Sequence, residues 1–213
     1  MTAESRNERL TREHFDALAD KYDLNGGTYL SPLPRLCSDR AAELVLARAR
    51  EGVIDIGCGT GYLLAKLAAE VPGFSGAGAD ISPRMLDVAR GKLAGVPGVT
   101  LVEATADDLP FPDGSFGAAV CVMSFHHYPR PEAALGEAAR VLASGGIYVI
   151  ADPLRESGTL EESIAAKRAD KETGEYAIYT PRELAAMAEN AGLEVTGEEF
   201  PAEGCFLLVM KKP

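Results

Sequence analysis

The chain has 213 residues, of which 32 are acidic and 21 basic, so its formal net charge at pH 7 is −11. This length fits one domain with a sizeable core, and an apolar fraction of 46% with a charged fraction of 25% is typical of globular chains. Residues 1–50 carry equal numbers of acids and bases, whereas 51–153 and 154–213 are both acidic. No segment is basic enough to attract nucleic acid or an anionic membrane, so neither is an expected partner.

The sequence shows no membrane-spanning or secretion signal. Its longest apolar run, residues 117–125, is far shorter than the ~20 residues of a membrane span, and residues 1–8 lack the apolar core of a signal peptide. We therefore expect a cytoplasmic protein, either a monomer or a homodimer. No metal is expected, because the cysteines lack the spacing of a metal site and are interpreted as buried thiols in a reducing compartment: Cys37, Cys58, Cys121 and Cys205.

Two amphipathic helices, over residues 8–20 and 34–50, predict a helical cap at the N-terminus, with a turn-rich stretch between them. From residue 53 onward, short apolar strands alternate with helices, which predicts βαβ units and a mostly parallel sheet. Gly145-Gly146 is the expected stop of the third of these helices. The strands are predicted at 53–56, 75–80, 99–102, 117–123 and 147–151, and the helices at 62–70, 83–93 and 131–142.

The last third begins with a polar helix at 159–171, within an expected helical insertion or lid over residues 154–180. A capping-box pattern starts a helix at 181–191. Strands at 194–200 and 205–210 must pair antiparallel, because a parallel pair needs a longer crossover. The fold class is therefore α/β, one domain over residues 1–213, with a doubly wound, Rossmann-like sheet of seven strands and helices on both faces.

A glycine-rich turn, Gly57-Cys58-Gly59-Thr60-Gly61, directly follows the first strand and opens a helix, which is where open α/β sheets bind nucleotide-like ligands. Its G-x-G-x-G spacing differs from the G-x-G-x-x-G of dinucleotide sites, which disfavours a nicotinamide-dependent oxidoreductase. Asp55 lies in the strand before the turn, and no Lys or Arg lies between Gly52 and Tyr62. That charge suits a ligand with an ammonium and a sulfonium better than a pyrophosphate. Asp80, which ends the second strand, is placed to accept hydrogen bonds from ribose hydroxyls.

Several segments together resemble class I S-adenosylmethionine-dependent methyltransferases, in particular the small-molecule and quinone-type group. Residues 53–61 look like the first motif of that family, and Gly78-Ala79-Asp80-Ile81-Ser82 resembles the second. Residues 108–116 are similar to the family's segment before the fourth strand, and His126-His127 and residues 140–146 match later landmarks. The resemblance covers about residues 50–152 and also fits the final hairpin.

The resemblance implies a cofactor site for S-adenosylmethionine, with S-adenosylhomocysteine as product. The glycine-rich turn would hold the methionine part of the cofactor, and Asp55 would interact with the ammonium group of that part. The turn consists of Gly57, Cys58, Gly59, Thr60 and Gly61. Asp80 would hold the ribose, with Ile81 against the adenine and Met85 nearby. Ala106 and Asp107 would lie along the adenine edge, where Thr105 replaces a frequent acidic residue. The remaining implied contacts are Met123 and Ser124 beside the methionine part and Tyr22 closing over the cofactor.

His127 is the preferred general base and His126 the second candidate, because both follow the fourth strand at the expected active-site end of the sheet. The alternative interpretation is that both histidines only shape the pocket. The acceptor pocket is expected between residues 10–35, 125–130 and 154–180, where aromatic side chains could enclose an apolar ring: Tyr29, Tyr128, Tyr176 and Tyr179.

The sequence therefore favours methyl transfer from S-adenosylmethionine to a small-molecule acceptor, by in-line displacement at the sulfonium methyl. Two alternatives stay open: a protein or RNA acceptor, and a protein that binds the cofactor without transferring its methyl group. The residues do not identify the acceptor or the attacked atom.

Overall fold

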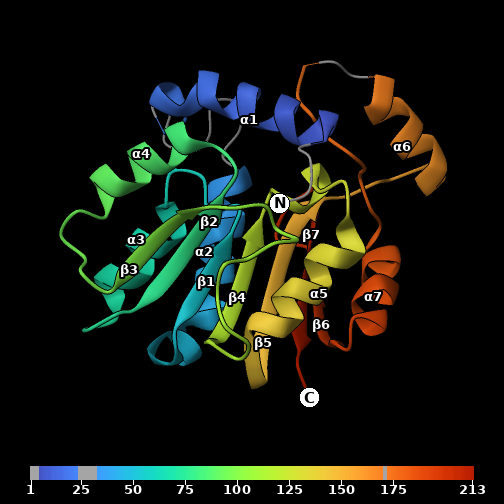
Figure 1. Ribbon diagram of the computed structural model, residues 1–213. Coiled ribbons are helices and arrows are strands. Elements are labelled where there is room, and N and C mark those ends of the chain that lie inside the picture. The colour runs from blue at the N-terminus through green and yellow to red at the C-terminus, as the bar shows by residue number, and fades with distance from the viewer. Residues whose placement is uncertain (1–4, 24–32, 170–171) are drawn as a thin grey trace.

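The computed structural model describes residues 5–23, 33–169 and 172–213, so the expected turn at 25–32 and Tyr29 lie outside the described residues. Its centre is a seven-stranded sheet in the order β3-β2-β1-β4-β5-β7-β6 (Figure 1). The strands are β1 (Val53–Ile56), β2 (Gly76–Asp80), β3 (Val99–Glu103), β4 (Phe116–Val122), β5 (Leu142–Pro153), β6 (Glu194–Glu199) and β7 (Cys205–Lys211).

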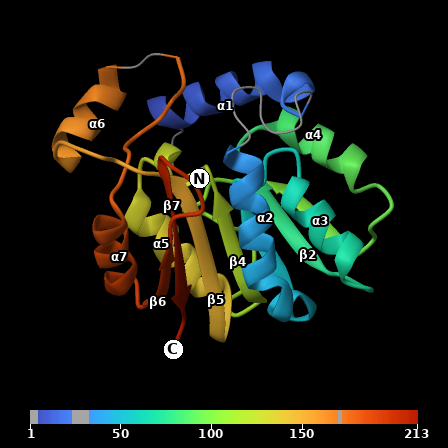
Figure 2. The ribbon, with the colours of Figure 1, turned by 180° about the vertical axis from the view of Figure 1, so that it is seen from behind.

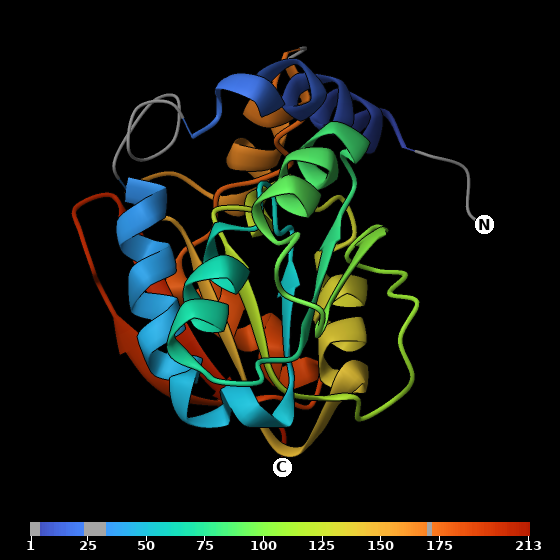
Figure 3. The ribbon, with the colours of Figure 1, turned by 90° about the vertical axis from the view of Figure 1, so that its left-hand side faces the viewer.

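Helices cover both faces of this sheet (Figure 3). Figure 1 shows α5 and α7 in front of the sheet, and Figure 2 shows α2 and α3 on the opposite face. The helices are α1 (Arg6–Leu18), α2 (Leu33–Val45), α3 (Tyr62–Glu70), α4 (Pro83–Lys92), α5 (Pro131–Val141), α6 (Leu160–Ala169) and α7 (Pro181–Asn190), with 3-10 turns at Ala19–Lys21, Leu46–Glu51 and Phe125–His127. Among the described residues, no helix combines the length and apolar character needed to cross a bilayer.

The strand order reverses at β1, which pairs in parallel with β2 on one side and with β4 on the other. In open α/β sheets a ligand binds at such a reversal, beyond the carboxyl ends of the strands. Only β7 runs against its neighbours β5 and β6, as the short hairpin predicts. The doubly wound, mostly parallel sheet with an antiparallel C-terminal strand is thus confirmed.

Alternate residues of the central strands point into two apolar layers. Ile54 and Cys121 belong to the layer under α5 and α7, where Leu135 and Leu184 pack. Val120 belongs to the opposite layer, under α2 and α3. The strands are therefore buried on both faces, which explains their nearly continuous apolar sequence.

Helix α5 ends at Val141, one residue before its predicted end at 142, but the prediction that Gly145-Gly146 stops it is wrong. Leu142 already has extended backbone, with ψ at 139°, and pairs with Phe116 at the start of β5. Gly145, with φ at +78°, instead donates its amide to the carbonyl of Lys212 at 2.8 Å. Pairing with neighbouring strands therefore ends the helix earlier than its own glycines would.

Helix α1 lies over the carboxyl ends of the strands, and α6 lies beside it (Figures 1 and 2). Ser5 and Glu8 form a capping box that starts α1. Further along the helix, Asp16 accepts a hydrogen bond of 2.6 Å from Ser82, the residue that caps α4. The expected N-terminal cap is thus attached directly to the loops that follow the strands.

Candidate active site

A cavity of about 800 Å³, including the space at its mouth, lies between α1 and the carboxyl ends of β1, β2 and β4. Its position at the reversal of the strand order is where open α/β sheets bind ligands. Most of the predicted cofactor residues line it: Tyr22, Gly57, Gly59, Asp80, Ile81, Met85, Thr105, Ala106, Asp107, Met123 and Ser124.

A second cavity, of about 550 Å³, lies on the other side of the glycine turn. Asp55, Cys58 and Thr60 line it, and Gly57 and Gly59 border both cavities. Arg35 of α2 also lines this second cavity, with its guanidinium 4.7 Å from the centre of the Tyr62 ring. The turn therefore lies between two cavities that share its glycines, and we treat them together as one candidate site.

The three glycines of the turn have different structural roles. A side chain at Gly57 would lie 2.0 Å from Ser124 Oγ, so this close approach requires glycine. Gly59, with φ at +51°, has no atom within 4 Å of a would-be side chain and leaves bare backbone beside the cavities. Gly61 lines neither cavity, and its missing side chain makes room for Ala89 of α4 and for Leu93, which follows that helix.

Asp80 is fixed by two backbone amides at the end of β2. Its carboxylate accepts hydrogen bonds from Gly59 N at 2.8 Å and Ser82 N at 2.9 Å. Burial raises the pKa of Asp80 to about 6, although these amides act in the opposite direction. The carboxylate is thus held rigidly at the cavity wall with acceptor capacity to spare, as ribose recognition requires.

Asp55 is 4% exposed, in the middle of β1. Burial raises its pKa to about 7, and the negative charge of Asp80 adds to this effect. Within the described part of the chain, no side chain forms an ion pair or hydrogen bond with the Asp55 carboxylate. A buried carboxylate without a cation is costly, so this group fits a site that is completed by a cationic ligand.

The backbone just after β4 is strained beside the cavity. Met123 has a φ of +50° although it carries a side chain, and its amide donates to Ala151 O at 2.7 Å. Next to it, Ser124 Oγ lies 3.0 Å from the hydroxyl of Tyr128, which donates to the carbonyl of Ile56 at 3.1 Å. Such strain is common at functional sites, and here it turns two predicted cofactor residues toward the cavity.

Asp107 lines the cavity, but its carboxylate is held by Arg130 rather than free. Arg130 also pairs with Glu8 of α1 at 2.6 Å, and all three side chains border the cavity. The hydrogen bond from Arg130 lowers the pKa of Asp107 although burial opposes it. Sequence reasoning missed Glu8 and Arg130, together with Thr11 and Phe15, which line the same cavity from α1.

The two candidate catalytic histidines occupy different environments. His127 lines the main cavity, with Nδ1 3.4 Å from Thr11 Oγ1 and its ring edge-on to Phe15. Burial and the adjacent His126 lower the pKa of His127 well below its ordinary value, so the imidazole is neutral and can accept a proton. His126 lines neither cavity and instead binds Asp152 at 2.9 Å.

Of the tyrosines predicted around the acceptor, only Tyr128 lines the main cavity within the described part of the chain. Tyr179 is 1% exposed and packs edge-on against Phe125 in the core. Tyr176 also packs against the apolar core and lines neither cavity. The prediction that Tyr176 and Tyr179 wall the pocket is therefore wrong, because the chain after α6 turns them toward the sheet.

Comparison with known proteins identifies the family. A methyltransferase domain matches residues 54–150. A demethylmenaquinone methyltransferase of Thermus thermophilus is 39% identical over 138 residues, which cover 64% of this chain and 62% of that protein. A ubiquinone/menaquinone biosynthesis C-methyltransferase UbiE of Azotobacter vinelandii is 36% identical over 162 residues, which cover 74% of this chain and 64% of that protein. The chain thus spans less than two thirds of the length of these curated relatives.

A solved structure supports the fold independently. It is the methyltransferase chain of a complex with the Haloferax volcanii Trm112 methyltransferase activator, with a TM-score of 0.75 and 24% identity, covering 95% of this chain and 97% of that one. At this identity the likeness shows the Rossmann-like fold alone. The family assignment rests on the matched domain and on the relatives in sequence: the chain belongs to the class I S-adenosylmethionine-dependent methyltransferases.

Proposed function

We propose that this protein transfers a methyl group from S-adenosylmethionine to a small-molecule acceptor, by in-line displacement at the sulfonium methyl. The observation that carries the proposal is the buried Asp55 beside a glycine turn, which pairs with no side chain in the described part of the chain, together with the carboxylate of Asp80 in the neighbouring cavity. Dinucleotide sites need neutral or positive surroundings for a pyrophosphate, and this turn offers negative charge instead.

The residues present fit S-adenosylmethionine at each of its parts. Asp55 would hold the ammonium, and Arg35, in the same cavity, would hold the carboxylate of the amino-acid tail. Asp80 would accept the ribose hydroxyls, while Ile81 and Ala106 would border the adenine in the main cavity. The bare backbone at Gly59 leaves room for the ligand where the two cavities meet.

When bound, the sulfonium supplies an already activated methyl group, so the protein mainly has to align the acceptor. Positioning of this kind contributes ~7–11 kcal/mol to lowering a barrier. His127 would take a proton from an acceptor that must lose one. Its Nδ1 lies beside Thr11 Oγ1 at 3.4 Å, which leaves Nε2 as the nitrogen for this role.

The proposed acceptor is a small hydroxylated ring of the quinone type. The two relatives compared above are named for quinone methylation, and the side chains of Phe15 and Tyr22 give the α1 side of the cavity an aromatic wall. An RNA acceptor is less well supported, because the chain is acidic overall, whereas the charge does not bear on a protein acceptor. The cytoplasmic location and the monomeric or homodimeric state stay predictions from the sequence.

A methyl-labelling experiment tests this function. The protein is incubated with S-adenosylmethionine carrying a tritiated methyl group and with separate fractions of cell extract: small molecules, protein and RNA. We expect label in the small-molecule fraction, increased when demethylated quinols are added. Label in protein or RNA alone would overturn the acceptor class, and cofactor binding without any transfer would support the binding-only alternative.

A further inference from the structure

The segment after α6 is held against the active site from several sides. We call residues 172–178 the strap. Thr11 Oγ1 of α1 donates to Gly174 O at 3.1 Å, and Asn7 Nδ2 donates to Glu175 O at 3.2 Å. The fit is close, because a side chain at Gly174 would lie 2.3 Å from the backbone nitrogen of Thr11. The strap and α1 therefore meet directly beside His127, which contacts the same threonine.

His126 holds the strap from the sheet side. Its carbonyl accepts hydrogen bonds from the amides of Tyr176 at 2.7 Å and Ala177 at 3.1 Å. Its ring lies between two carboxylates, with Nδ1 2.9 Å from Asp152 and Nε2 3.8 Å from Glu175. A neutral imidazole has one N–H, whereas two carboxylates facing its two nitrogens favour the doubly protonated, charged form.

The surroundings of this ring agree with a buried cation. Asp152 is fully buried at the end of β5, and its second oxygen has no partner among the described residues. Burial alone would lower the pKa of His126, but Asp152 and Glu175 outweigh it and the net direction is upward. Besides each other, the two histidine rings face four charged or titratable groups: Asp152 on β5, Glu175 on the strap, Lys167 on α6 and His14 on α1. Lys167 also forms an ion pair with Glu175.

We infer that His126 is a positioning residue: joined to Asp152 and Glu175, it holds the strap closed against α1 and fixes His127 at the cavity wall. The two rings are in contact, with centres 4.3 Å apart. The strap closure follows from these contacts alone. Its consequence for methyl transfer rests on the proposed function.

Closure should depend on pH with a definite sign. The link to Glu175 is complete below the ordinary histidine pKa of 6.5 and is lost as the pH rises through the raised value of His126. As the pH rises through that value, hydrogen exchange at the amides of Tyr176 and Ala177 should speed up by more than the pH dependence of their intrinsic exchange rates explains. Amides of the central strand β4 serve as an internal reference, because they report global stability.

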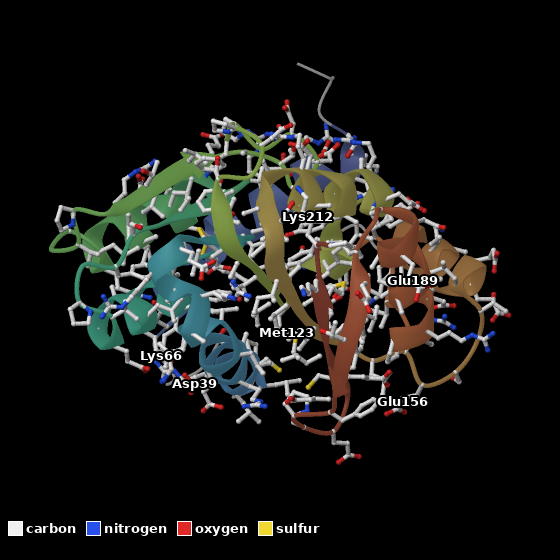
Figure 4. The ribbon with its side chains drawn as sticks, turned by 90° about the horizontal axis from the view of Figure 1, so that it is seen from below. Asp39, Lys66, Met123, Glu156, Glu189 and Lys212 are labelled. Carbon is white, nitrogen blue, oxygen red and sulfur yellow. The ribbon has the colours of Figure 1, made fainter. Side chains whose placement is uncertain are left out.

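Amide hydrogen exchange of the whole protein, free of ligand, tests the closure. Compared variants are Glu175→Gln, His126→Gln and the matched control Glu189→Gln, whose exposed side chain lies on α7 (Figure 4). In Glu175→Gln we expect protection at Tyr176 and Ala177 to fall about tenfold, the loss typical of one charge-assisted contact, and its pH dependence to disappear. Unchanged protection in Glu175→Gln, or pH-independent protection in the native protein, would overturn the inference.

The catalytic consequence has a separate readout. In the labelling assay, we expect kcat of the native protein to fall at alkaline pH. Glu175→Gln should remove this alkaline limb and should lower kcat more than it raises the KM for cofactor. A normal profile in a variant whose strap exchanges freely would refute a positioning role. If the native protein transfers no methyl group, the proposed function fails, but the hydrogen-exchange result still tests whether His126 and Glu175 hold the strap closed. Failure of the proposed function and failure of the strap inference are therefore distinguishable.

Discussion

Replacing Asp55 with asparagine should make the ligand-free protein more stable while weakening its binding of cofactor. The carboxylate is 4% exposed in β1, has a pKa of about 7 in the folded protein, and has an ordinary value of 3.8. Because the pKa of Asp55 is raised in the folded protein, its protonated carboxyl contributes fully to folding stability below about pH 4. That contribution is lost as the pH rises through about 7. Asparagine has the same shape and no charge, so it avoids that loss.

The size of the effect follows from the pKa difference. About three pKa units, at 1.36 kcal/mol each, give about 4 kcal/mol of destabilisation by the native carboxylate at pH 8. This is an upper value, since the buried asparagine amide also needs partners. The cofactor would lose a charge-assisted hydrogen bond to its ammonium, worth ~1.5–3 kcal/mol, or roughly 10- to 150-fold in Kd.

Thermal unfolding at pH 8 and pH 4.5, with calorimetric titration of S-adenosylhomocysteine, measures both effects. We expect a higher Tm for Asp55→Asn at pH 8, a much smaller difference at pH 4.5, and a higher Kd for the ligand. The matched control is Asp87→Asn on the exposed side of α4, which should change neither quantity. 5′-Methylthioadenosine, which lacks the amino-acid tail, should bind both proteins alike. A lower Tm at pH 8 with unchanged affinity would refute the reasoning.

Four further substitutions separate stability, cofactor binding and chemistry. Gly57→Ala should cost at least ~2 kcal/mol of folding free energy by chemical denaturation, because the added methyl group has no space, whereas Gly59→Ala should mainly raise the Kd for cofactor. Arg130→Ala should destabilise the protein by ~1–3 kcal/mol, since it leaves the buried carboxylate of Glu8 with the Ser5 amide but without its cationic partner, and a normal Tm would contradict this. His127→Gln should lower kcat by ~10²–10⁴ at unchanged cofactor affinity if the acceptor loses a proton, and an unaltered kcat would exclude a general base there.

The sheet could be predicted from the sequence because its signals are local. β1 and α3 begin and end where predicted, since Gly52 and the glycine turn bound a short apolar run. The final hairpin follows from chain length alone. The start of β5 at Leu142, five residues before the predicted strand, could not be predicted, because Leu142 pairs with Phe116 of a neighbouring strand. Tertiary pairing overrides the local glycine signal there.

The candidate site was predictable at its motif positions and not at its long-range contacts. Asp80 lies at the cavity because it ends a strand beside the reversal of strand order. Glu8 and Arg130 are 122 residues apart in sequence, and no local sequence pattern indicates that they form an ion pair. His126 and His127 are adjacent in a tight 3-10 turn, so their sequence positions do not decide which ring faces the cavity.

The most direct test of the account is calorimetric titration of the protein with S-adenosylhomocysteine and, separately, with NADH. The account predicts one S-adenosylhomocysteine per chain, no heat with NADH, and at least about tenfold weaker S-adenosylhomocysteine binding in a folded Asp80→Ala variant, which loses hydrogen bonds to a carboxylate. Tight NADH binding without a response to S-adenosylhomocysteine, or unchanged affinity in Asp80→Ala, would contradict it.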